Sequence, residues 1–270
     1  MANYEAKQIG KVKGLGTAYE VSAPLDKQIE AFNDVGIVSL ASPEEEAILR
    51  IAGVSNKYSR TSMAPVGVKG EKPILYRVSP FMNPAMTRVA VGAHGSGKYP
   101  SLDRDFYEAV EGIAKADEGL EPEDRRAIVL QSSDNFDLSP EMEEARFIFG
   151  NSTAKYFDKF SHKVIPFYNL PLEDTPKGKC AVNYLWFDGP QDGSVLDAGD
   201  GDLDDDVRAS GVLRSAVGAS SGISNPTLTQ IRKANLEAIP RVFEQEGLSR
   251  LSDLVGDSLN RELLETLRKK

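Results

Sequence analysis

A glycine-rich segment that ends in lysine is the first place where this sequence could bind a ligand. Gly92 is followed, after four residues, by Gly97 and Lys98, which is the spacing of a phosphate-binding P-loop. Backbone N–H groups in such a loop can form a nest for an anion, and the lysine adds a positive charge. An apolar run from Thr87 to Val91, with the composition of a strand, leads into the glycines. The segment therefore has three features of a phosphate site.

Two residues break the P-loop pattern. Tyr99 stands where the pattern has Ser or Thr, and it cannot supply the compact hydroxyl that holds magnesium. Pro100 disfavours a helical conformation at the residue before it, so we expect the next helix to begin near Ser101, after the loop. The apolar run ending at Leu130 is followed by Gln131 and not by an aspartate. The sequence favours a glycine-rich surface loop over a nucleoside triphosphatase site and leaves an anion-binding loop open.

Charge is unevenly distributed along the chain. The 270 residues carry a formal net charge of −9, which disfavours a protein that coats nucleic acid. The stretch from Ile51 to Lys98 nevertheless has seven basic residues and one acidic residue, Glu71. The stretch from Asp188 to Asp206 has eight aspartates and no basic residue. Blocks of opposite sign predict charge-directed contacts, either with a partner or between copies of the chain.

The end of the basic stretch is where we expect an anion to bind. The candidate residues are those of the glycine-rich loop and the arginines of the same stretch, namely His94, Gly95, Ser96, Gly97, Lys98, Arg60, Arg77 and Arg88. Tyr58, Tyr76 and Phe81 are interleaved with the basic residues, a pattern that can bind single-stranded nucleic acid. The acidic balance of the whole chain favours the acidic loop of a neighbouring copy as the occupant instead.

Motifs for nucleophilic catalysis are incomplete. Gly218–Gly222 matches a nucleophile elbow centred on Ser220, but both histidines, His94 and His162, precede it, whereas in that fold the histidine follows the serine. Ser152–Lys155 has the spacing of penicillin-recognising serine enzymes without their Lys-Thr-Gly strand. No acid–base–nucleophile set is evident, so the sequence favours a protein that is not an enzyme.

Metal and thiol chemistry are poorly supported. The chain has one cysteine, Cys180, and two histidines, which excludes an intrachain disulfide and a zinc site built from N and S ligands. A buried structural role is the default for such a cysteine. The aspartates of Asp197–Asp206 are possible ligands for a divalent cation, although Asp205 and Gly211 depart from the EF-hand pattern. We expect no cofactor and leave cation binding by this loop open.

Periodicity predicts an α+β fold: a mixed, largely antiparallel sheet with flanking helices and a helical C-terminal region. Ser42, Pro43 and Glu45 predict a capped helix that stops near Gly53. The other predicted helices cover residues 101–117, 139–150 and three segments after 203; predicted strands cover 35–40, 73–79, 86–93, 125–133, 163–170 and 180–187. We expect an arm with one strand over residues 1–25, a body over 26–199 and a helical region over 200–270.

The function predicted from these observations is partner binding. We expect a non-enzymatic assembly protein, a subunit of a larger complex or particle that uses opposite-charge surfaces. The alternative is a protein, or an enzyme, that binds phosphate, a nucleotide or nucleic acid through residues 92–98. The sequence has neither an N-terminal secretion signal nor an apolar run long enough to span a membrane, so we expect a soluble cytoplasmic protein.

Overall fold

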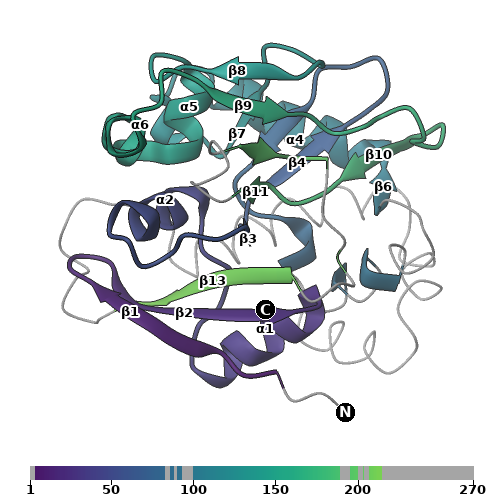
Figure 1. Cartoon of the computed structure of the whole chain (residues 1–270). Helices are drawn as coiled ribbons and strands as arrows, with labels where there is room; N and C mark the ends of the chain where they lie inside the picture. Colours follow the sequence, from purple (N-terminus) through teal and green to yellow (C-terminus); the bar gives the residue numbers. More distant parts are fainter. Residues whose placement is uncertain are drawn as a thin grey trace, which may run out of the picture. The chain divides into compact units, whose positions relative to one another are not determined.

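The structure, a computed structural model, describes residues 4–82, 86–87, 90–92, 100–188, 195–199, 203 and 207–214 (Figure 1). The chain divides into two compact units, Met1–Ser221 and Gly222–Lys270. All described residues belong to the first unit, so the helices predicted after residue 221 lie outside them.

Two β-sheets and several helices build the first unit, and the predicted α+β class is confirmed. The larger sheet has the strand order β1-β2-β13-β3-β11-β12-β9-β8, and the smaller has the order β6-β10-β4-β5-β7. Pairing is antiparallel except between β9 and β12 and between β3 and β13. The strands are β1 (Lys7–Val12), β2 (Gly16–Ala23), β3 (Ser59–Arg60), β4 (Ala64–Gly67), β5 (Ile74–Tyr76), β6 (Ser101–Asp103), β7 (Ala127–Val129), β8 (Phe136–Leu138), β9 (Ile165–Tyr168), β10 (Lys179–Val182), β11 (Trp186–Phe187), β12 (Leu196–Asp197) and β13 (Val207–Leu213).

The N-terminal residues form a hairpin that is joined to the sheet. β1 and β2 pair antiparallel around a turn in which Gly14 has φ +83°, a conformation that glycine adopts without strain. β13 pairs with β2 from Val207 to Leu213. Residues 204–218 were predicted as a helix, and this prediction is wrong for 207–213. All seven residues of this segment pair with β2, so the strand is set by this pairing and not by a helical stripe.

One extended ladder connects the two sheets. β3 pairs with β11, and β4 pairs with β10. Between these pairs, backbone hydrogen bonds continue from Thr61 N to Leu185 O and from Asn183 N to Pro65 O, both at 3.1 Å. The residues 180–187, predicted as one strand, therefore form two strands in different sheets. Their partners come from residues 59–67.

The helices include one whose ends follow closely from its sequence. α2 spans Pro43–Ile51, and the Ser42 side chain and the Glu45 side chain cap each other's backbone as predicted. The other helices are α1 (Leu25–Asp34), α4 (Arg104–Ala116), α5 (Glu143–Phe149) and α6 (Thr153–Phe160), with 3-10 turns at Pro80–Met82, Pro122–Asp124 and Gly150–Ser152. The helix predicted from residue 101 begins at Arg104, because Ser101–Asp103 pair with β10.

Two predicted strands have other structures. Residues 35–40 form a turn and one bend after α1, in which Ile37 and Leu40 are buried while Val38 is 60% exposed. Residues 86–87 and 90–92 are helical, so the strand predicted over 86–93 is wrong. Both stretches are apolar runs too short for periodicity to separate a strand from a buried turn or helix.

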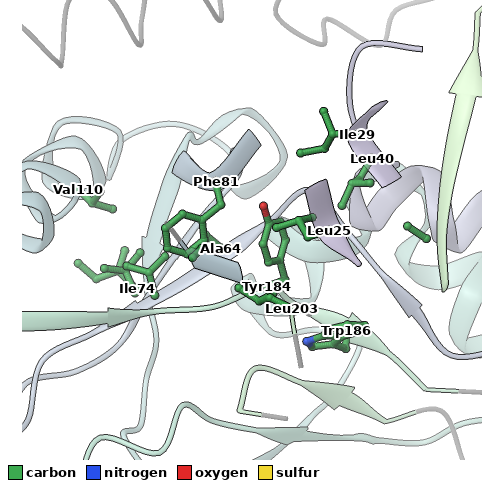
Figure 2. Packing of buried hydrophobic residues seen from close by; sticks show 14 of the residues in the cluster. Leu25, Ile29, Leu40, Ala64, Ile74, Phe81, Val110, Tyr184, Trp186 and Leu203 are labelled. Atoms are coloured by element: carbon green, nitrogen blue, oxygen red, sulfur yellow. The ribbon is translucent and has the colours of Figure 1, made fainter. Parts of the chain in front are cut away.

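Two hydrophobic clusters make up the core. The first packs α1 and α4 against both sheets; Figure 2 shows Leu25, Phe81, Tyr184 and Trp186 among its members. The second joins α5 and α6 to β8, β9 and β11, and Phe149 stacks on Tyr156 at 4.7 Å between ring centroids. The strands β8 and β9 thus have one face buried under helices, and the opposite face is left for contacts with other molecules.

Candidate binding surfaces

The glycine-rich loop lies mostly outside the described residues. The undescribed stretch 93–99 contains five of the predicted candidates, His94, Gly95, Ser96, Gly97 and Lys98. A sixth candidate, Arg88, lies in the undescribed stretch 88–89. The stretch that leads into the loop is helical, and β6 follows it. A P-loop needs a strand before the glycines and a helix directly after them. Neither neighbour has the required structure, while anion binding by the loop itself stays a prediction.

Arg60 is a core residue. Its side chain is fully buried, and its Nη1 donates a hydrogen bond of 2.9 Å to the Gln28 side chain. The guanidinium lies over the Trp186 ring, 4.6 Å from the centroid, and 5.7 Å from that of Tyr184. Burial lowers the pKa of Arg60 to about 10, which still leaves it charged at neutral pH. These contacts hold β3 to α1 and β11 and leave no open path from the guanidinium to solvent.

Arg77 also has internal partners. Its Nη2 donates to the backbone oxygens of Pro122 at 3.2 Å and Glu123 at 2.7 Å, and its Nε donates to that of Arg125. The guanidinium lies over the Phe147 ring at 4.3 Å. Burial lowers the pKa of Arg77. The side chain ties β5 to the 3-10 turn at residues 122–124.

The predicted basic stretch is therefore not one surface. Arg60 and Arg77 are used inside the fold. Lys57 and Lys69 are exposed, but they lie beyond opposite ends of the extended ladder formed by residues 59–67. An extended chain rises about 3.3 Å per residue, so the two ends of this ladder are on the order of 20–25 Å apart. Sequence proximity overstates how closely these charges gather.

A different set of basic residues gathers around one hollow, which we call the basic hollow. It has a volume of about 390 Å³ and is lined by Val68, Lys69, Arg104, Thr175, Pro176, Lys177, Gly178 and Lys179. Three segments contribute: the turn after β4, the first residue of α4 and the turn before β10. Only Lys69 comes from the predicted basic stretch. Every charged side chain in this lining is basic.

Carboxylates outside the lining orient two of these cations. Arg104 donates from Nε to Glu108 and from Nη2 to Glu71, both at 3.1 Å, and these hydrogen bonds raise its pKa. Lys179 pairs with Asp103 at 2.5 Å. Because Glu108, Glu71 and Asp103 are themselves exposed, these pairs are weak in energy. They nevertheless fix the direction of the two basic side chains beside the hollow.

A second surface lies on β9, near one end of the larger sheet (Figure 1). Along this strand, Ile165 and Phe167 are buried in the second core, whereas the alternate residues point outward. Val164 and Tyr168 are 43% and 44% exposed, and Pro166 is half-buried. We call Val164, Pro166 and Tyr168 the β9 stripe. It is an apolar row on the open face of a strand.

Acidic residues flank the β9 stripe on both neighbouring strands. Asp137 of β8 is directly opposite Pro166, and Asp197 of β12 is directly opposite Tyr168. Asp137 is exposed, and Asp197 is half-buried with its Oδ1 accepting a hydrogen bond of 2.7 Å from Gly199 N. Directly opposite residues on adjacent strands have side chains on the same face. The stripe is therefore an apolar row between two carboxylates.

Of the other residues predicted to carry chemistry, Cys180 is described by the structure, whereas the Ser220 motif and most of the aspartate loop are not. Cys180 is buried, and burial raises the pKa of its thiol to about 11; the thiol donates to Asp103 O at 3.4 Å, as suits a structural residue. The Ser220 motif and most of Asp197–Asp206 lie outside the described residues. Among the residues that are described, no three or more His, Cys, Asp or Glu side chains are grouped as metal ligands.

Sequence reasoning missed both surfaces. The basic hollow joins residues 69, 104 and 175–179, which are far apart in the chain, and pairing of β10 with β4 and β6 brings them together. The β9 stripe had a detectable signal, because Val164, Pro166 and Tyr168 alternate with Ile165 and Phe167. Because the residues on both faces of this strand are apolar or aromatic, hydropathy alone could not show which face is open.

None of the helices in the described part of the chain is long and apolar enough to cross a membrane.

Comparison with known proteins identifies the fold. The sequence matches no protein-family model and no curated protein. This chain is similar in structure to one solved protein, which is described under the words "Accommodation of massive sequence variation in Nanoarchaeota by the C-type lectin fold". The similarity has a TM-score of 0.51 at 15% sequence identity and covers 78% of this chain and 99% of that one. The first unit of this chain thus has a fold similar to the C-type lectin fold.

Proposed function

We propose that this chain is a non-enzymatic partner-binding protein, a subunit of a larger assembly, that contacts its partner through the β9 stripe. The observation that carries the proposal is the apolar row of Val164, Pro166 and Tyr168 between Asp137 and Asp197. A tyrosine in an apolar patch with charged residues beside it is typical of the residues that dominate binding energy at protein interfaces.

The fold supports this proposal. The C-type lectin fold is of the binding type, and in the similar protein it accommodates massive sequence variation. A scaffold that tolerates such variation keeps its core while its surface residues change. In this chain the second core holds β9 from one side, through Ile165 and Phe167, and so presents the stripe on a rigid strand.

Charge defines the partner. The carboxylates of Asp137 and Asp197 beside the stripe favour a partner surface that carries lysine or arginine. A second copy of this chain offers such a surface at its basic hollow, so the two surfaces could join copies into an assembly. A different protein with a basic patch around an apolar pocket would fit the stripe equally well. In both cases the association weakens with salt.

Tyr168→Ser tests the proposal most simply. Tyr168 is exposed at the surface, so the substitution should leave the fold intact while removing the aromatic anchor from the stripe. We expect the affinity for the partner, or for a second copy, to fall by about tenfold or more. The measurement is size-exclusion chromatography with light scattering on protein purified at low salt with its partner.

Leu120→Ser is the matched control. Leu120 is 48% exposed in the turn after α4 and belongs neither to β9 nor to its neighbours β8 and β12, so its replacement should leave the association unchanged. If Tyr168→Ser and Leu120→Ser behave alike, the stripe is not the contact surface and the proposal fails.

A further inference from the structure

The basic hollow has the size and lining of a ligand pocket. Its volume of about 390 Å³ lies within the range of pockets that hold small molecules. Four cationic side chains line it, those of Lys69, Arg104, Lys177 and Lys179. Three carboxylates pair with Arg104 and Lys179, so among the described residues the uncompensated positive charge of the hollow comes from Lys69 and Lys177, and this charge favours an anion as the occupant.

The donors that remain unused fit an oxyanion. Arg104 uses Nε and Nη2 for Glu108 and Glu71, which leaves Nη1 to donate. Lys69 makes only one long hydrogen bond, 3.3 Å to Glu173 O. The Lys177 ammonium makes no ion pair with any described residue. Thr175 adds a hydroxyl to the lining. Arginine with several lysines is the combination that recognises phosphate oxygens.

The lining also limits the rest of the ligand. The volume exceeds that of a bare phosphate ion, so the hollow has space for a small polar group attached to the phosphate. Its apolar lining is confined to Val68 and Pro176, and its lining residues include no aromatic ring on which a nucleobase could stack. Recognition therefore rests on charge and hydrogen bonds.

From this geometry we infer that the basic hollow binds a small non-aromatic phosphate, such as a sugar phosphate or a diphosphate, with Lys177 and Arg104 as the principal contacts. The site shares no residue with the β9 stripe, and phosphate binding there does not require the proposed partner. It also differs from the glycine-rich loop at residues 92–98.

Titration calorimetry at fixed ionic strength tests this inference. The probes are pyrophosphate, ribose 5-phosphate and adenosine monophosphate, with sodium chloride adjusted so that every solution screens charge equally. We expect saturable binding of pyrophosphate and ribose 5-phosphate, and no tighter binding of adenosine monophosphate than of ribose 5-phosphate. Absence of saturable binding by all three probes would overturn the inference, and clearly tighter binding of the nucleotide would overturn the ligand class.

Two lysine substitutions locate the site. Lys177→Gln removes one charge from the hollow without breaking any ion pair, and we expect the pyrophosphate affinity to fall by about tenfold. Lys155→Gln removes the same charge from the exposed face of α6 and should leave the affinity unchanged. Equal losses in both variants would show non-specific attraction and contradict the site.

A poly-aspartate peptide provides the last comparison. If this peptide binds the wild-type protein more tightly than pyrophosphate does and displaces pyrophosphate, the hollow recognises an acidic chain and the inference is wrong. Because Tyr168→Ser leaves the hollow untouched, loss of partner binding in that variant and loss of phosphate binding in Lys177→Gln can be scored separately.

Discussion

Arg60 and Arg104 show how differently this chain uses two arginines. Arg60 lies in the core, stacked over Trp186 and bonded to Gln28, while Arg104 is exposed at the rim of the basic hollow. Counting charges along the sequence gives both the same weight. The fold assigns one to stability and leaves the other for binding.

We predict that Arg60→Ala lowers the free energy of unfolding by about 3 kcal/mol. The substitution leaves a cavity beside Trp186 and removes the donor that satisfies Gln28 Oε1 inside the protein. Chemical denaturation at pH 7 measures the change. Lys57→Ala, at an exposed residue of the same stretch, should change stability by less than about 0.5 kcal/mol. Similar values for the two variants would show that Arg60 has no structural role.

Glu44 gives a pH-dependent prediction. Burial raises the pKa of this carboxyl above its ordinary value of 4.5, against the opposing effects of a hydrogen bond from Asn151 N and the charge of Arg77. Because the pKa of the carboxyl is higher in the folded state than in the unfolded state, protonation of Glu44 favours folding. This contribution is fully present below the unfolded-state pKa and is lost as the pH rises through the folded-state pKa. At neutral pH the ionised carboxylate is therefore a net cost.

Glu44→Gln should thus gain stability relative to the wild type as the pH rises from about 4 to 7, since glutamine can still accept the hydrogen bond from Asn151. Denaturation at several pH values measures this difference, and Glu141→Gln, at an exposed carboxylate, serves as the control. A difference between Glu44→Gln and wild type that stays constant with pH would contradict the burial of this charge.

At the scale of elements, local signals predicted α2 and failed for the short strands. The capping box of Ser42 and Glu45 is local, so residues 42–53 contain the information that fixes both ends of the helix. β3 and β11 have two residues each, and pairing with a distant segment, not propensity, creates them. Thr87 and Val91 show the reverse error, since these β-branched residues lie in helical stretches of a run that was predicted as a strand.

The capping box also supports a prediction for α2. Ser42→Ala removes the acceptor for Glu45 N, which donates at 3.2 Å, and we expect the free energy of unfolding to fall by about 1 kcal/mol. Thermal and chemical denaturation measure the loss. Ser42→Asp should restore most of it, because aspartate also accepts at this position. An unchanged stability in Ser42→Ala would show that α2 is fixed by packing alone.

At the scale of the whole molecule, the surfaces depend on topology. The overall class followed from the sequence, because apolar runs, capping residues and turn residues together specify sheets with helices on them. The basic hollow did not follow, because β10 has to pair with both β4 and β6 before Lys69, Arg104 and Lys179 meet. Such long-range pairing is not encoded in any one segment.

The most direct test of partner binding is native mass spectrometry of the protein purified at low salt from its own cells. We expect a species heavier than the 29.4 kDa chain, which dissociates at high salt and is lost in Tyr168→Ser but retained in Leu120→Ser. A 29.4 kDa species alone at low salt, or a complex that Tyr168→Ser leaves intact, would contradict it.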